Sequence, residues 1–94
     1  MIKVSVMYSK GDDVNFDMEY YKTAHMAIVD RTMKPARWDI DSGVDGPYVA
    51  VGNLYFESME AFQAGVGAAG EAMADVPNFT NAENAMQVSE IVEV

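Results

Sequence analysis

Residues 48–56 read YVAVGNLYF and form the strongest β-strand signal in the chain. β-Branched and aromatic residues, which are enriched in strands, dominate this segment, and a turn-rich stretch with Gly43, Gly46 and Pro47 precedes it. The apolar and aromatic side chains fall on both parities: Val49, Val51 and Tyr55 on one, and Tyr48, Ala50, Leu54 and Phe56 on the other. We therefore expect both faces of this strand to be apolar and to need cover.

Three further segments carry strand patterns. Residues 2–8 alternate in polarity, so that every second side chain faces the same way. Residues 36–42 alternate charged and uncharged side chains, which is typical of an edge strand. Residues 84–94 end the chain with a fourth strand pattern. The sequence therefore predicts four strands.

A first helix is predicted over residues 18–33. Asp17 is a good N-terminal cap, and Phe16 and Tyr21 have the spacing of a hydrophobic staple around it. Pro35 forbids continuation of the helix. At 100° per residue, His25 falls near the middle of the apolar arc.

A second helix is predicted from its cap Ser58 to about Met73. Gly65, Gly67 and Gly70 interrupt it, and each costs a helix up to about 1 kcal/mol relative to alanine. We expect these glycines to mark close packing against the sheet or a pocket wall, so that Gly67→Leu would lower stability or ligand binding.

The order strand, helix, strand, strand, helix, strand predicts an α+β, ferredoxin-like βαββαβ fold with a four-stranded antiparallel sheet. Residues 1–94 would form one such domain, with both helices on one face of the sheet. The other face would be bare, and an identical subunit stacking sheet on sheet would cover it. The sequence therefore predicts a homodimer.

Composition narrows the classes of partner. The 94 residues include 15 acidic and 6 basic side chains, for a formal net charge of −9, and this charge repels phosphate backbones and anionic lipid headgroups. We therefore expect neither nucleic acid nor a membrane as partner. The chain has no cysteine and opens on a strand pattern rather than a signal peptide, so we expect a cytoplasmic protein.

Three runs carry a resemblance to a known family. They are FDMEYYKTAHM at residues 16–26, LYFESMEAFQ at residues 54–63 and ADVPNFTN at residues 74–81. Together they resemble the EthD family, named after a protein linked to ethyl tert-butyl ether degradation, and the resemblance spans essentially residues 1–94. It implies the dimeric α/β barrel superfamily, in which two ferredoxin-like subunits pack their sheets together.

The resemblance implies less about the activity of the protein than about its fold. Related dimeric barrels include cofactor-free oxygenases, isomerases, cyclases and haem enzymes, and many EthD-like proteins carry only a reductase or degradation label. The family commonly follows its histidine with Met-Pro, whereas Met26 is followed here by Ala27. We therefore expect a straighter helix at this point.

His25 and Tyr21 are the candidate catalytic residues. His25 is the only histidine, and its side chain titrates near neutrality, so it could act as general acid or base toward a small carbonyl or phenolic ligand. The alternative is a core histidine bonded to a backbone carbonyl. Tyr21 lies one helical turn earlier on the same face, where its phenol could orient the imidazole or donate to a substrate, or serve as staple and core.

Five further residues are candidate ligand contacts: Tyr20, Trp38, Tyr55, Asn78 and Thr80. Tyr20 points nearer the rim of the helix. The aromatic side chains of the strands suit a flat apolar or aromatic ligand between helices and sheet, but they also suit packing at a dimer interface. Asn78 and Thr80 lie in a predicted loop, where polar residues serve either function or turn structure.

No bound cofactor or metal is expected. The acidic residues have neither calcium-loop spacing nor enough histidine partners for zinc. Residues 65–70 have the glycine spacing G-x-G-x-x-G, but they fall inside a predicted helix rather than after a strand, which argues against a nucleotide cofactor.

Two functions remain open from sequence. The first is a small enzyme without a nucleotide cofactor, an oxidoreductase, isomerase or cyclase of a catabolic or biosynthetic pathway, in which His25 moves a proton. The second is a ligand-binding or accessory module of the same fold. The absence of an evident carboxylate to orient His25 favours the second, and its place on the apolar face favours the first.

Overall fold

Strand β3 (Tyr48–Phe56) lies inside a four-stranded sheet with the order β2-β3-β1-β4 in this computed structural model, which describes residues 1–94. The other strands are β1 (Ile2–Ser9), β2 (Arg37–Ser42) and β4 (Asn84–Glu90). All three neighbouring pairs are antiparallel, and β2 is an edge strand. The predicted ferredoxin-like arrangement is confirmed.

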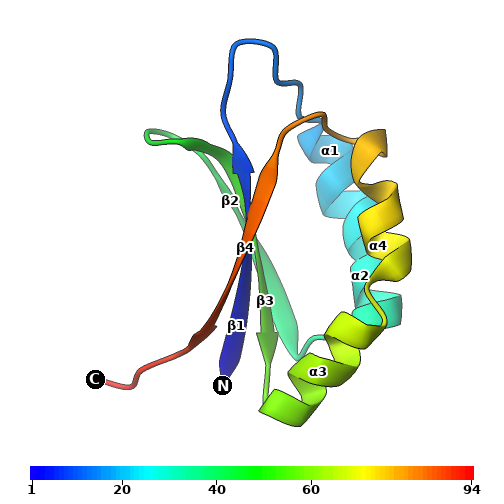
Figure 1. Ribbon diagram of the computed structural model, residues 1–94, viewed down its shortest axis with the longest axis vertical. Helices are drawn as coiled ribbons and strands as arrows, with labels where there is room; N and C mark the ends of the chain where they lie inside the picture. Colours follow the sequence, from blue (N-terminus) through cyan, green and yellow to red (C-terminus); the bar gives the residue numbers. More distant parts are fainter.

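The helices all lie on one side of the sheet (Figure 1). The first helical region consists of α1 (Met18–Tyr20), a π-helical turn (Tyr21–His25) and α2 (Met26–Met33). The second consists of α3 (Met59–Gly67), α4 (Gly70–Asp75) and a short 3₁₀ turn (Val76–Asn78). The largest fully buried side chains, Val4, Met26 and Phe56, come from both layers, so the core lies between helices and sheet.

The first helical region begins and ends as its sequence predicts. The Asp17 carboxylate accepts from the backbone N–H of Tyr20 at 3.0 Å, and the rings of Phe16 and Tyr21 pack edge to face with centroids 5.1 Å apart. Lys34, in the left-handed region with φ 52°, ends α2 just before Pro35. Ala27 lies in the regular part of α2, and the irregularity of this region is the π-helical turn just before it, from Tyr21 to His25.

The second helix is broken where a continuous one was expected, at Ala68 and Ala69. Only Gly65 is packed closely: a Cβ there would lie 2.6 Å from Cε1 of Phe56. A Cβ on Gly67 or Gly70 would meet no atom within 4 Å. The expectation that Gly67 marks tight packing is therefore wrong, since that glycine faces open space.

The sheet face away from the helices is more polar than expected. Asn53 lies on this face with only 2% of its surface exposed, and its amide donates to Asp39 at 2.8 Å and to Asp41 at 2.9 Å. The Tyr55 hydroxyl donates to Asp39 at 3.1 Å, and Ser5 donates to Asn53 at 3.3 Å. The prediction that both faces of β3 are apolar is wrong, because Asn53 shares the parity of Val51 and Tyr55.

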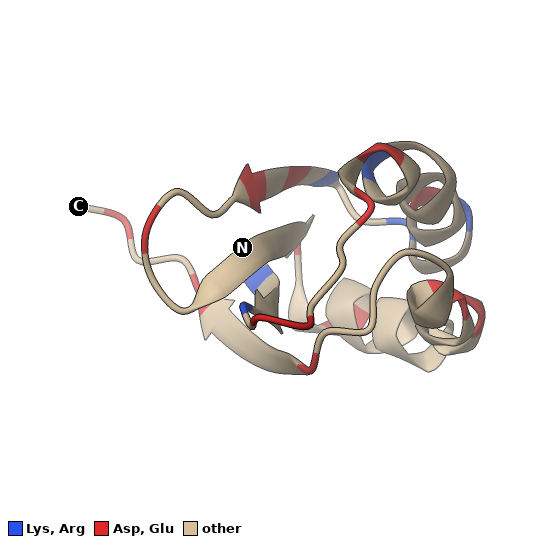
Figure 2. Ribbon diagram, turned by 90° about the horizontal axis from the view of Figure 1, so that it is seen from above, with Lys and Arg blue, Asp and Glu red and all other residues tan.

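Acidic residues are spread over strands, loops and helices and greatly outnumber the basic ones (Figure 2). None of the helices combines the length and apolar character that a membrane span requires. No three or more histidine or acidic side chains come together in a way that could hold a metal ion.

Candidate functional site

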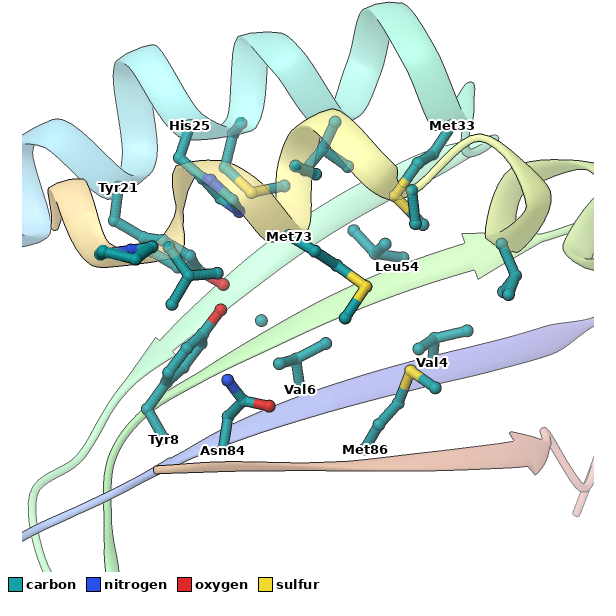
Figure 3. A pocket seen from close by; sticks show the side chains of 18 residues that line it. Val4, Val6, Tyr8, Tyr21, His25, Met33, Leu54, Met73, Asn84 and Met86 are labelled. Carbon is teal, nitrogen blue, oxygen red and sulfur yellow. The ribbon is translucent and has the colours of Figure 1, made fainter. Parts of the chain in front are cut away.

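A cavity of about 450 Å³ lies between the helices and the sheet (Figure 3). Its walls are mainly apolar, with Val4, Val6 and Leu54 from the sheet and Met33 from α2 among them, and no lysine, arginine, aspartate or glutamate lines it. Met73 of α4 and Met86 of β4 also border it, with 71% and 59% of their surfaces exposed, so the cavity opens between these elements. The sheet face that the helices cover is therefore hollow rather than fully packed.

His25 forms a buried pair with Asp75 at the wall of this cavity. The distance from its Nδ1 to Oδ2 of Asp75 is 3.0 Å, and the two residues are 4% and 8% exposed. The helix face of the first region brings the imidazole inward, and the end of α4 supplies the carboxylate. The sequence-based expectation that His25 has no carboxylate partner is wrong.

Two more donors hold Asp75 in place. Its Oδ1 accepts from the Tyr20 hydroxyl at 2.7 Å and from the Asn78 amide at 2.9 Å. Burial alone would raise the pKa of Asp75, but the hydrogen bonds from Asn78, Tyr20 and His25 together outweigh it and hold this pKa below its ordinary value. The carboxylate is therefore ionised and fixed in orientation at neutral pH.

The same environment keeps His25 neutral. Burial lowers the pKa of the imidazole, and the hydrogen bond and charge of Asp75 only partly oppose this effect. An ionised Asp75 accepts the proton of Nδ1, which leaves Nε2 with a free lone pair. Every fully buried side-chain nitrogen and oxygen has a hydrogen-bond partner. Nε2 of His25 bonds to no protein group, so it is not fully buried and is open to the cavity that His25 lines. Nε2 can therefore accept a hydrogen bond or a proton from a molecule in the cavity.

Tyr21 also lines the cavity and stacks on His25. The two rings lie 5.3 Å apart between centroids and are inclined by only 17°. The π-helical turn between them places both side chains on the cavity side, and such turns are frequent at functional sites. The structure thus brings the two candidate catalytic residues together.

The segment that follows α4 braces this pair. Phe79 is buried and its ring lies 4.6 Å from that of His25. Its backbone carbonyl accepts from the N–H of Asp17, and the Thr80 hydroxyl donates to the carbonyl of Asn15 at 2.7 Å. Residues 75–80 therefore tie the start of the first helix to the end of the second.

The candidate ligand contacts have different positions. Tyr20 and Asn78 reach the site only through Asp75. Trp38 is half-buried against the core outside the cavity, and Tyr55 lies on the far face of the sheet under the guanidinium of Arg37. Asn78 and Thr80 border a separate polar hollow of about 310 Å³ at the surface.

Sequence reasoning missed Asp75, Tyr8 and Gly52. Asp75 stands 50 residues after His25, although it opens the Asp-Val-Pro-Asn-Phe-Thr run that carried the family resemblance. Tyr8 lines the cavity from β1, opposite Tyr21. Gly52 interrupts an otherwise bulky strand, and that interruption is the signal that could have indicated a close approach to the sheet.

The chain matches no family model, and no curated protein matches it significantly. Among solved structures, an EthD-like protein of Ralstonia eutropha is 31% identical with a TM-score of 0.87, over 98% of this chain and 92% of that one. An EthD family protein of Bacillus halodurans is 15% identical with a TM-score of 0.66, over 98% and 99% of the two chains. A cofactor-independent oxygenase of Streptomyces nogalater is 13% identical with a TM-score of 0.57, over 97% and 93%.

These structures define the class of this protein as ferredoxin-like, of the dimeric α/β barrel type. The identity and coverage of the Ralstonia protein then establish the family. The chain belongs to the EthD family.

Proposed function

We propose that this protein is an enzyme that moves a proton on a small, largely apolar or aromatic ligand, with His25 as general base. The observation that carries the proposal is the buried His25–Asp75 pair, whose free Nε2 opens into an apolar cavity. A histidine serving only as core would have no reason to keep one nitrogen unpartnered beside such a cavity.

The chemistry needs only the side chains of the site. Neutral His25 takes a proton from a carbon next to a carbonyl, and the C–H electron pair forms the enolate. Asp75 stabilises the imidazolium that results, and Tyr20 and Asn78 hold Asp75. Return of the proton at another position completes an isomerisation, which requires no other reactant.

The structural neighbours support a reaction of this kind. The Streptomyces protein of the same fold is described as a cofactor-independent oxygenase. Formation of an electron-rich carbanion by a protein base is a natural first step for chemistry without a bound cofactor. The alternative proposal, a module that binds the same ligand without turnover, predicts binding but no proton exchange.

Exchange of the α-protons of α-tetralone, an enolisable aromatic ketone, tests the proposal in heavy water by proton NMR. We expect the wild type to accelerate exchange and His25→Asn to lose this acceleration about 100-fold or more. Asp75→Asn should lose a similar factor, because a carboxamide does not hold the tautomer with a free Nε2. Tyr48→Phe, outside the cavity, is the matched control.

Binding without exchange distinguishes the two proposals. A wild type that binds α-tetralone but leaves its exchange rate unchanged would support the binding module. If His25→Asn kept the exchange rate but lost several degrees of melting temperature, His25 would be structural.

We also propose that the protein is a homodimer joined through the bare face of its sheet. All helices lie on the opposite face, and Val49 and Val51 remain partly exposed on the bare one. Light scattering coupled to size exclusion should give twice the 10.3 kDa of the chain. A monomer at micromolar concentration would contradict this assembly.

A further inference from the structure

Two tyrosine hydroxyls meet at one end of the cavity. Tyr8 of β1 and Tyr21 of the π-helical turn are each 2% exposed, and their rings are 5.6 Å apart between centroids at an angle of 78°. Their hydroxyl groups point toward one another at this end of the cavity (Figure 3). Each hydroxyl has the other as its hydrogen-bond partner and bonds to no third group of the protein, so a ligand oxygen between them can accept from both in place of this bond.

Gly52 makes this placement of Tyr21 possible. A Cβ at position 52 would lie 2.0 Å from the Tyr21 hydroxyl oxygen and 3.3 Å from the ring carbon that carries it. Any other residue would push the phenol away from the sheet and from Tyr8. β3 therefore has no side chain at the position where the Tyr21 hydroxyl packs against it.

Both phenols act as hydrogen-bond donors at neutral pH. Burial raises the pKa of Tyr8 to about 12, and burial together with the neighbouring Tyr8 raises the pKa of Tyr21 further. No lysine or arginine lines the cavity, so a permanent negative charge would enter it without a counter-ion. Negative charge that develops on an oxygen between two donors is stabilised instead.

The polar groups occupy one end of the cavity only. His25, Tyr21, Tyr8 and the amide of Asn84 gather there, while Val4, Leu54 and Met33 line the other end (Figure 3). A ligand that satisfies both ends has one polar head and a flat apolar body. Its head lies beside His25, because Tyr21 stacks on the imidazole.

We propose that the hydroxyls of Tyr8 and Tyr21, in the room that Gly52 leaves, bind the carbonyl oxygen of an uncharged, enolisable ketone with a flat apolar body. This inference rests on the proposed function and names its substrate class. The proton leaves the carbon next to the carbonyl for Nε2 of His25, the C–H pair becomes the C=C bond, and the C=O π pair moves to the oxygen. That oxygen is held by the two phenols until the proton returns.

Binding of three related probes tests the proposal without any need for turnover. α-Naphthol mimics the enol of α-tetralone, α-methylnaphthalene has a similar shape without the oxygen, and α-naphthoate adds a negative charge. Fluorescence titrations of the purified full-length protein should show that α-naphthol binds about tenfold or more tightly than either other probe.

Variants that lack one hydroxyl then test whether Tyr8 and Tyr21 bind the ligand oxygen, a role called here the tyrosine anchor. Tyr8→Phe and Tyr21→Phe each keep the ring and should each reduce the preference for α-naphthol over α-methylnaphthalene about fivefold. Tyr48→Phe removes a hydroxyl outside the cavity and should leave the preference unchanged. Gly52→Ala should act like Tyr21→Phe, although it leaves both hydroxyls in the chain.

The results separate this inference from the proposed function. An unchanged preference in both Tyr→Phe variants, or tighter binding of α-naphthoate in the wild type, would overturn the tyrosine anchor. If the Tyr→Phe variants reduce the preference for α-naphthol but the wild type does not accelerate exchange on α-tetralone, the tyrosine anchor is supported and the role of His25 as base is contradicted. If exchange depends on His25 but the Tyr→Phe variants keep the preference, only the role of His25 is supported.

Discussion

The two faces of the sheet use their polar groups in opposite ways. On the bare face, the buried amide of Asn53 accepts from Ser5 and donates to Asp39 and Asp41, so its hydrogen-bonding groups are satisfied within the protein. On the helix face, Tyr8 of β1, three residues after Ser5, has its hydroxyl beside a cavity with only the Tyr21 hydroxyl as partner. Because buried polar groups are normally fully paired, polar groups that keep free hydrogen-bonding capacity next to an apolar cavity indicate a site, and closed networks indicate structure.

The largest stability effect should come from breaking the network of the bare face. Asn53→Leu removes the amide that donates to Asp39 and Asp41 and leaves their carboxylates side by side, at a cost on the order of 3 kcal/mol. Urea unfolding would measure it. The affinity for α-naphthol should not change, because the cavity lies on the other face.

Gln63→Leu is the matched control for this variant. Gln63 is exposed on α3, away from the face through which the proposed dimer forms, so its loss should change the free energy of unfolding by no more than about 0.5 kcal/mol. Equal effects of the two variants would mean that the network contributes nothing, and a weaker affinity for α-naphthol in Asn53→Leu would mean that the two faces are coupled.

A pair of glycine variants sharpens the comparison on the helix side, where part of the layer is packed and part is hollow. Gly65→Ala places a Cβ 2.6 Å from the Phe56 ring and 3.0 Å from the Met33 carbonyl oxygen, and should cost about 2 kcal/mol. Gly67→Ala meets no neighbour and should stabilise by up to about 1 kcal/mol through helix propensity. Thermal unfolding compares them directly, and a destabilised Gly67→Ala would restore the sequence-based expectation.

The sequence predicts the fold well because each strand and helix carries a local pattern. The β-branched and aromatic residues of segment 48–56 and the cap at Asp17 are short-range signals. Helical periodicity is another, and it places His25 and Tyr21 on one helix face. The cavity depends on contacts between distant segments, and no periodicity reports these. Asp75 therefore appears in the sequence as a loop residue, although it is the partner of His25.

Two other features escape local patterns for different reasons. The π-helical turn shifts hydrogen bonds without changing the kind of residue on each face, so the composition of residues 18–33 does not reveal it. Asn53 is a single polar residue in an apolar strand, and its importance depends on Asp39 and Asp41 of the neighbouring strand.

The smallest expected effect is a pH dependence confined to the helix side. Because burial lowers the pKa of His25 below its ordinary value of 6.5, the folded protein binds fewer protons at this site than the unfolded chain in the window just below pH 6.5. The stability that neutral His25 contributes is therefore complete above this value and is lost as the pH falls through the window. Asp75 stays ionised there, since its own pKa lies below 3.8.

The difference between wild type and His25→Asn isolates this effect from the other carboxylates. Between pH 7 and 5 the free energy of unfolding should fall more steeply for the wild type than for the variant. The difference between the two slopes corresponds to at most one bound proton, or about 1.4 kcal/mol per pH unit. Proton exchange on α-tetralone should decline over the same range, because a protonated imidazole is no longer a base. Asn53→Leu should keep the wild-type slope, since the bare face holds no histidine. Parallel stability curves for wild type and His25→Asn would show that the imidazole has the same pKa in the folded and unfolded chain, and the argument for a buried neutral base would fail.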